Sequence, residues 1–214
     1  MTVSLRAAGL AAAVLAAVGL LAAPASAESF PALAFPFEAG QQAYSAGIHS
    51  DDGTGGVRNA IDFSPADGTV RAALAGTVRL QHCSGGDWVT VDHPGGWRTG
   101  YYHLEGIRVT DGEHVEAGTV LGSTGNALPC GGSSTGAHVH FTLWTLPDAA
   151  AGDWDGVAFA RISTAVAAAL GEPVDGKTLG GWRFAAGPEQ YSGTATHLAD
   201  GAVVRLPGRF RATP

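Results

Sequence analysis

Residues 136–143 have the sequence GAHVHFTL, in which histidine and threonine alternate with apolar residues. Side chains on a β-strand point to opposite faces with a period of two. The pattern therefore predicts a strand with His138 and His140 on one face and apolar residues on the other. Two histidines that share a face can look into one cleft, where one binds a metal ion and the other moves a proton.

The same kind of alternation continues on the N-terminal side of this strand. Between residues 69 and 145, short apolar runs are separated by glycine turns such as PGG at 94–96. Closely spaced short strands with such turns indicate an antiparallel sheet, sandwich or barrel. The 32 glycines and 11 prolines of the 214 residues also favour a turn-rich chain over a helical bundle. We therefore expect a mainly β fold.

Residues 155–170 have a different pattern. They are rich in alanine, their larger apolar residues recur near helical spacing, and Gly171 and Pro173 follow as stop signals. The sequence predicts one amphipathic α-helix here, inserted near the C-terminal part of the β domain. Closing strands are expected at 179–185 and 202–206.

The N-terminus has the pattern of a secretory signal. Arg6 precedes an apolar run over 7–23, and Ala25-Ser26-Ala27 is a cleavage site of the small-residue type. A transmembrane anchor is the alternative, but no basic stop-transfer flank follows the run. We expect residues 1–27 to be removed and the mature protein to be secreted, without a membrane anchor.

The remaining chain divides into three parts by the same reasoning. We expect an N-terminal segment at 28–46, one domain at 47–206 that contains the candidate site, and a frayed C-terminal tail at 207–214. The domain is long enough to bury a core of its own, and we expect a monomer.

The net charge of −7 argues against nucleic-acid binding, which requires a basic surface. The two cysteines, Cys83 and Cys130, form an even pair, which in an exported protein indicates a disulfide. A pair of thiolates on a metal ion is the alternative. A disulfide across this loop would stabilise the fold by about 4 kcal/mol in the chain-entropy model.

Four residues along the chain can build a metal site: His49, Asp62, His138 and His140. A catalytic zinc ion takes three protein ligands and keeps a fourth position open. The set can supply three ligands and leave one histidine for proton transfer. No His-Glu-x-x-His segment occurs, so a helix-borne zinc protease site is excluded.

Four segments in this order resemble the beta-lytic, lysostaphin-like zinc metalloendopeptidases. They are GIHS at 47–50, IDFS at 61–64, WRTGYYHL at 97–104 and CGGSSTGAHVHF at 130–141. The long gap between His49 and Asp62 is similar to the beta-lytic and staphylolysin branch. The segment GGWRFAAGPEQY at 180–191 carries a weaker resemblance.

The resemblance implies the roles of particular residues. Carried over by position, Zn²⁺ would be bound by His49, Asp62 and His140, and the non-ligand catalytic histidines would be His103 and His138. His138 could instead be a fourth ligand, which would close the site and make it structural. The resemblance also implies a disulfide between the two cysteines that pins the loop before His138.

The positions of His103 and the tyrosines carry further expectations. A strand over 97–104 would place Tyr101 on the face of His103, with Tyr102 and Leu104 on the other. The segment at 180–191 resembles the one that brings a tyrosine, here Tyr191, to the site in this branch. We expect its hydroxyl to stabilise the developing oxyanion, with a surface loop tyrosine as the alternative. For Tyr102 we expect a packing role. The other histidines, His82, His93, His114 and His197, belong to no catalytic motif.

The predicted chemistry is metal-assisted hydrolysis of an amide, with His103 or His138 as the acid and base. The resemblance implies a peptidoglycan peptide as substrate, with glycine-rich cross-bridges as the bonds cut. The alternatives are a non-catalytic module that binds the wall or a partner, and a general secreted protease for glycine-rich proteins.

Overall fold

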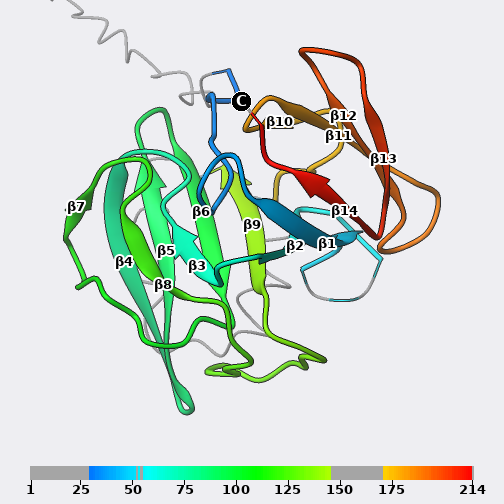
Figure 1. Cartoon of the computed structure of the whole chain (residues 1–214). Helices are drawn as coiled ribbons and strands as arrows, with labels where there is room; N and C mark the ends of the chain where they lie inside the picture. Colours follow the sequence, from blue (N-terminus) through cyan, green and yellow to red (C-terminus); the bar gives the residue numbers. More distant parts are fainter. Residues whose placement is uncertain (1–28, 52, 54, 146–170, 214) are drawn as a thin grey trace, which may run out of the picture.

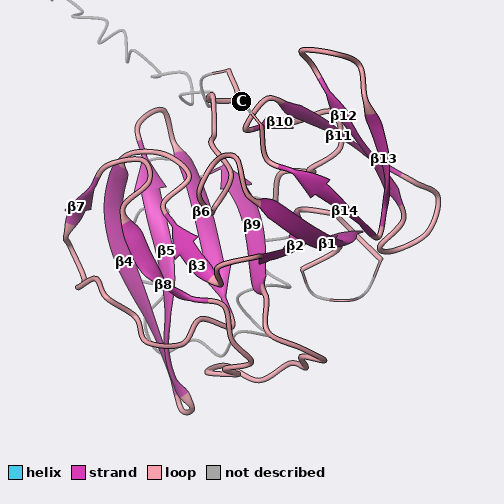
Figure 2. Ribbon diagram, in the orientation of Figure 1, coloured by secondary structure: helices cyan, strands magenta, loops and turns pink. Residues whose placement is uncertain are grey.

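The computed structural model describes residues 29–51, 53, 55–145 and 171–213 (Figure 1). All regular elements in these ranges are β-strands (Figure 2), which confirms the expected mainly β, antiparallel fold. The helix expected at 155–170 and the signal expected at 1–27 lie outside the described residues. Within the described part, no helix has the length and apolar character that a membrane crossing would require.

The strands, in chain order, are β1 (Gln42–His49), β2 (Ala60–Pro65), β3 (Thr69–Arg71), β4 (Gly76–Cys83), β5 (Gly86–His93), β6 (Trp97–Tyr102), β7 (His114–Val115), β8 (Val120–Ser123), β9 (Val139–Thr145), β10 (Thr178–Leu179), β11 (Trp182–Ala186), β12 (Gly193–His197), β13 (Val203–Leu206) and β14 (Gly208–Arg211).

These strands form three antiparallel sheets. The large sheet has the order β14-β1-β2-β9-β6-β5-β4-β7, and a small sheet has the order β10-β11-β12-β13. A two-stranded sheet, β3-β8, completes the fold. The small sheet lies beside the β14-β1 end of the large sheet (Figure 1).

The centre of the large sheet has one strictly apolar face. Ile48, Ile61, Phe141 and Tyr101 are register partners across β1, β2, β9 and β6, and all four are fully buried. Cutting one large aromatic of such a row back to alanine costs about 3–5 kcal/mol. Because side chains alternate, the residues one position along each strand face the opposite side, so burial of this row fixes which residues face the cleft.

Phenylalanines join the two larger sheets into one core. Phe35, in the N-terminal segment, packs against Phe63 of β2, Phe184 of β11 and Phe210 of β14, with ring centroids 5.3–6.3 Å apart. Aromatic contacts of this kind contribute beyond the area they bury. The N-terminal segment therefore forms part of the core between the sheets.

The C-terminal segment differs from the expectation of a frayed tail at 207–214. Residues 208–211 form β14, which pairs with β1 from Gln42 to Ser45, and Phe210 is buried. The buried side chain of Phe210 and the four residue pairs with β1 hold this segment in place.

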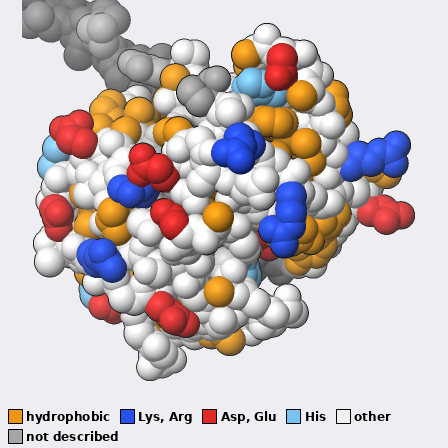
Figure 3. All heavy atoms as spheres, in the orientation of Figure 1, with side chains coloured by type: hydrophobic (Ala, Val, Ile, Leu, Met, Phe, Trp, Pro, Cys, Tyr) orange, Lys and Arg blue, Asp and Glu red, His pale blue; other side chains and the backbone are white. Residues whose placement is uncertain are grey.

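Acidic and basic side chains are interspersed over the face of the molecule shown in Figure 3.

Candidate metal centre and active site

Three neighbouring strands bring His49, Asp62 and His140 to one face of the large sheet. Asp62 in β2 is the register partner of His140 in β9. His49, the last residue of β1, pairs with Ala60, two positions from Asp62. Directly opposed and diagonal partners on one face lie within side-chain reach. The sheet register therefore makes these three side chains converge.

The donor atoms of the three residues are close enough to share one ion. Asp62 Oδ1 lies 3.1 Å from His49 Nε2 and 3.1 Å from His140 Nδ1, and the three donor atoms are all within 4.8 Å of one another. Tetrahedral bonds of about 2.0–2.1 Å place ligand atoms roughly 3.3 Å apart. Two imidazoles and one carboxylate at this spacing can hold a divalent metal ion. His138 lies outside this cluster of donors.

The charge state of the group suits metal binding. Burial would raise the pKa of Asp62, but the hydrogen bonds with His140 and His49 outweigh it and hold the pKa far below its usual value. Burial would lower the pKa of His140, but its hydrogen bonds with Asp51 and Asp62 raise it to about 10. Asp62 is therefore ionised, and a metal ion must displace a proton from His140 when it binds.

His103 reaches the site by an irregular backbone. β6 ends at Tyr102, and His103 follows with a φ of 66°, in the left-handed region. Its ring centroid lies 4.6 Å from that of His138 and 6.0 Å from that of His140. The expectation that Tyr101 shares its face is wrong: Tyr101 packs in the core against Phe141. The left-handed turn, not strand alternation, directs His103 to the metal side.

The two non-ligand histidines each use Nδ1 to hold their position. His103 Nδ1 donates to the carbonyl of Ala127 at 2.9 Å, and His138 Nδ1 donates to that of Gly136 at 2.7 Å. This leaves Nε2 as the proton acceptor of each ring. Burial lowers the pKa of His103 to about 4, so this ring is neutral at physiological pH and can accept a proton.

Tyr191 lies over the metal ligands, on the connection between β11 and β12. Its ring stacks on His49 with centroids 4.6 Å apart, and the side chain remains 45% exposed. Burial raises the pKa of its hydroxyl, and the negative charge of Asp62 raises it further. The raised pKa keeps the hydroxyl protonated, so it can donate a hydrogen bond.

Contacts with the large sheet fix the loop of Tyr191. The N–H of Tyr191 donates to the carbonyl of Ile48 at 2.7 Å, and a Cβ on Gly47 would lie 1.9 Å from the Tyr191 carbonyl oxygen. Gln190 exchanges two hydrogen bonds with Ser50. Arg58 donates to the carbonyl oxygens of Gly187, Pro188 and Glu189. Sequence analysis assigned no role to Arg58, which belongs to no motif, or to Gln190, which lies within the segment at 180–191.

Sequence analysis also missed Asp51, which directly follows Ser50 and looks like an ordinary loop residue. Its side chain is fully buried, and its Oδ1 accepts a hydrogen bond from His140 Nε2 at 2.6 Å. These two residues are separated by 89 positions. An acidic residue two positions after His49 was the only sequence signal for this contact.

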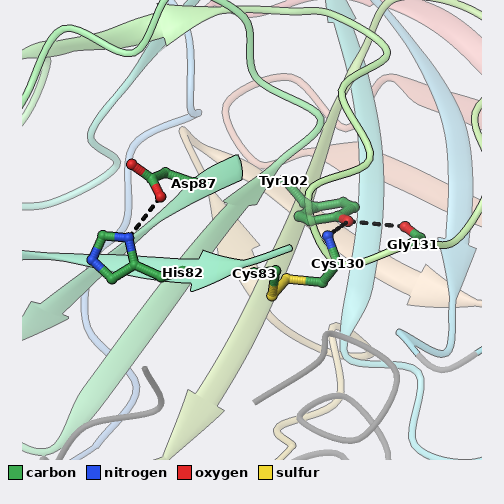
Figure 4. The surroundings of a disulfide bond; sticks show 6 residues. All are labelled: His82, Cys83, Asp87, Tyr102, Cys130 and Gly131. Carbon is green, nitrogen blue, oxygen red and sulfur yellow. Dashed lines mark hydrogen bonds and ion pairs between the residues drawn. A yellow bond between two sulfur atoms is a disulfide. The ribbon is translucent and has the colours of Figure 1, made fainter. Parts of the chain in front are cut away.

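Cys83 and Cys130 form a disulfide with Cα atoms 5.1 Å apart (Figure 4). This confirms the expected bond and rules out the alternative of a thiolate pair on metal. The Tyr102 hydroxyl lies beside it, donating to the Gly131 carbonyl and accepting from the Cys130 N–H, both at 2.9 Å. The disulfide and Tyr102 together anchor the loop that leads to His138.

The remaining histidines bond to groups outside the metal cluster. His93 is buried and bonds Ala75 and Thr99. His82 pairs with Asp87, His114 with Glu116, and His197 with Asp200.

Comparison with known proteins agrees with this arrangement. The profile of peptidase family M23 matches residues 56–152. Protease LasA of Pseudomonas aeruginosa is 44% identical over 109 residues, which cover 45% of this chain and 25% of the relative. Beta-lytic metalloendopeptidase of Lysobacter enzymogenes is 34% identical over 122 residues, covering 52% of this chain and 67% of the relative. The chain thus spans about a quarter of LasA.

A solved structure shares the fold. Pseudoalterin, described as an M23 metalloprotease from the deep sea, superposes with a TM-score of 0.66 at 24% identity, covering 86% of this chain and 99% of that chain. The fold, the His-Asp-His group and the sequence matches together define the class of this domain as that of the M23 peptidases. The chain belongs to peptidase family M23.

Proposed function

We propose that this chain is a secreted zinc endopeptidase that hydrolyses peptide bonds in peptidoglycan cross-bridges, with a preference for glycine-rich bonds. The observation that carries the proposal is the register-fixed group of His49, Asp62 and His140, with two further histidines beside it. Imidazole nitrogen and carboxylate oxygen are donors that zinc prefers, and a three-ligand set leaves an open position.

Zinc in this site would polarise the scissile carbonyl and lower the pKa of the attacking water. His103, neutral with its Nε2 unprotonated, is the base that takes the proton of the water. The same proton can then pass to the leaving amine, with His138 beside it as the second group able to carry it. The Tyr191 hydroxyl would donate to the oxyanion that develops on the carbonyl.

Two features support the wall substrate and the location. The matched relatives include a beta-lytic metalloendopeptidase, and the four motifs resemble its branch. The disulfide in the structure is of a kind that persists in oxidising compartments. With the signal-like sequence at 1–27, this supports export of the chain.

The first test is metal analysis followed by digestion of a defined cell wall. We expect about one zinc per chain and, by mass spectrometry, new N-termini at cross-bridge glycines. Loss of wall turbidity should stop when a chelator is added. A chain that holds zinc but releases no fragments would instead be a non-catalytic binding module.

A second comparison separates the wall enzyme from a general protease. An oligoglycine peptide and an elastin-like peptide are digested under matched conditions, and the values of kcat/KM are compared. We expect the oligoglycine peptide to be the better substrate. Equal or faster cleavage of the elastin-like peptide would favour a general protease for glycine-rich proteins. Size-exclusion chromatography tests the expectation that the protein is a monomer.

A further inference from the structure

We infer that Asp51 is a positioning residue that fixes the orientation and tautomer of His140, so that Nδ1 of this ring is held ready as a metal donor. The inference rests on the proposed function and deepens it, because it assigns a role to a residue outside the ligand set. It begins from one contact, in which His140 Nε2 donates to Asp51 Oδ1 at 2.6 Å.

The chemistry of this contact determines which nitrogen of His140 carries the proton. In this hydrogen bond the imidazole N–H donates and the carboxylate oxygen accepts, so the nitrogen that faces Asp51 Oδ1 is the protonated one. When a metal ion displaces one of the two ring protons, the N–H that remains is the one bonded to Asp51, so Nδ1 presents its lone pair to the ion. Nδ1 is the atom that lies 3.1 Å from Asp62 Oδ1, on the metal side. Asp51 thus selects the tautomer that metal binding needs.

The hydrogen-bond partners of His140 differ from those of the other three histidines of the site. His49, His103 and His138 each donate Nδ1–H to a backbone carbonyl, those of Ser50, Ala127 and Gly136. His49 and His140 both contact Asp62, but His140 also contacts a second carboxylate, that of Asp51, through Nε2. A carboxylate behind a ligating imidazole raises the basicity of the ligand and orients the ring.

Asp51 is itself held in place. Its side chain is fully buried, and its N–H donates to Asn59 Oδ1 at 3.3 Å. Asn59 is also buried and donates to the carbonyl of Leu143 in β9 at 3.4 Å, so it ties the loop to the strand that carries His140. Buried carboxylates are rare unless they are paired, and among the described residues Asp51 Oδ2 has no hydrogen-bond partner. The hydrogen bond from His140 is the pairing that compensates for the burial of the Asp51 carboxylate.

The decisive experiment measures zinc affinity of the full chain by competition with a chromophoric chelator. We expect Asp51→Asn to weaken zinc binding about 10–100-fold, as loss of an outer-shell partner does. The cobalt-substituted variant should show a shifted d–d spectrum, because the ring of a ligand is reoriented. Asp92→Asn is the matched control, since Asp92 pairs with Arg98 and Arg79 far along the sheet. It should leave zinc affinity unchanged.

A folded Asp51→Asn variant with the zinc affinity and cobalt spectrum of the parent would overturn the inference. Where the variant fails to fold, imidazole ¹⁵N shifts of the zinc-loaded parent decide: the inference requires a protonated Nε2 on His140, and an unprotonated Nε2 would contradict it. Failure of the proposed function looks different, because the parent chain would then bind no zinc or would leave wall peptides uncut.

Discussion

The large and small sheets contribute to the site in different ways. The large sheet supplies all three proposed metal ligands from strands that are hydrogen-bonded neighbours, β1, β2 and β9. The small sheet supplies Tyr191 through the connection between β11 and β12. The donor atoms that lie together come from positions that the register fixes, whereas the tyrosine that stacks on His49 is carried by a loop.

The loop is nevertheless not independent of the large sheet. Arg58, Ser50 and Gly47 all lie on or beside β1 and β2, and each contacts the chain between Gly187 and Tyr191. The large sheet thus carries the proposed metal ligands on its own strands and positions Tyr191 through contacts with the loop that carries it. Variants in the two regions should therefore separate metal binding from turnover.

The largest effect is expected at the centre of the metal group. Asp62→Ala removes the carboxylate that lies 3.1 Å from both ligand histidines. It should abolish stoichiometric zinc and lower kcat/KM about a thousand-fold or more, because metal catalysis contributes several kcal/mol. Zinc content and peptide hydrolysis are measured together. A variant that retains one zinc per chain would show that Asp62 is not a ligand.

His103→Ala should retain zinc and lose turnover. His103 is near the ligands but outside the donor cluster, and loss of a general base costs about 10²–10⁴-fold in kcat. His82→Ala, which changes a half-exposed histidine paired with Asp87, is the control and should keep full activity. Normal kcat in His103→Ala would assign the proton transfer to His138.

Tyr191→Phe should leave zinc affinity unchanged and lower kcat about 100-fold, the loss typical of one oxyanion donor. The ring that stacks on His49 is kept, so only the hydroxyl is tested. Steady-state kinetics with a glycine-rich peptide give kcat and KM separately. A change in KM alone would indicate substrate binding without a role in the chemical step.

Arg58→Ala tests whether the large sheet aims the loop. Loss of the hydrogen bonds to the carbonyls of residues 187–189 should lower kcat, by no more than Tyr191→Phe does, because misplacement of a group costs up to about 10²-fold. In a Tyr191→Phe background, Arg58→Ala should have little further effect on kcat. Full additivity of the two changes would show that Arg58 acts by another route.

The smallest effect concerns His93, a buried histidine of the large sheet outside the site. Burial lowers its pKa from the ordinary value of 6.5, so the folded chain binds fewer protons there than the unfolded chain. Stability from this group is present above pH 6.5 and is lost as the pH falls toward the folded-state pKa. His93→Gln should flatten the curve of denaturant midpoint against pH below pH 6.5. An unchanged slope of stability against pH would mean that other titrating groups dominate the pH dependence in this range.

The strands that carry the ligands were predictable because alternation is a local property. The sequence GAHVHFTL at 136–143 places His140 opposite the apolar residues, and the structure has β9 at Val139–Thr145. β12 and β14 escaped prediction because their sequences are short and rich in glycine, threonine and arginine, without a clear period of two. Pairing with β11 and β1 forms them, and pairing partners are not visible in a segment alone.

The proposed ligands, His103 and His138 could be singled out from the sequence because their motifs lie in short, contiguous segments. The side of the sheet on which His103 lies could not be predicted, because its left-handed backbone conformation after β6 reverses the face that alternation predicts. The clamp of Arg58 on Gly187 joins residues 129 positions apart, and no local pattern encodes that contact.

The order of residues along the chain thus indicated the candidate site residues and the two faces of the strand that carries His140, because alternate residues of a strand point to opposite faces. Folding in three dimensions specified what surrounds those side chains. Asp51 meets His140 across 89 positions of sequence, and Tyr191 is laid over His49 by a loop from the other sheet. Such contacts depend on how loops close and which strands pair, and both are fixed when the whole core packs.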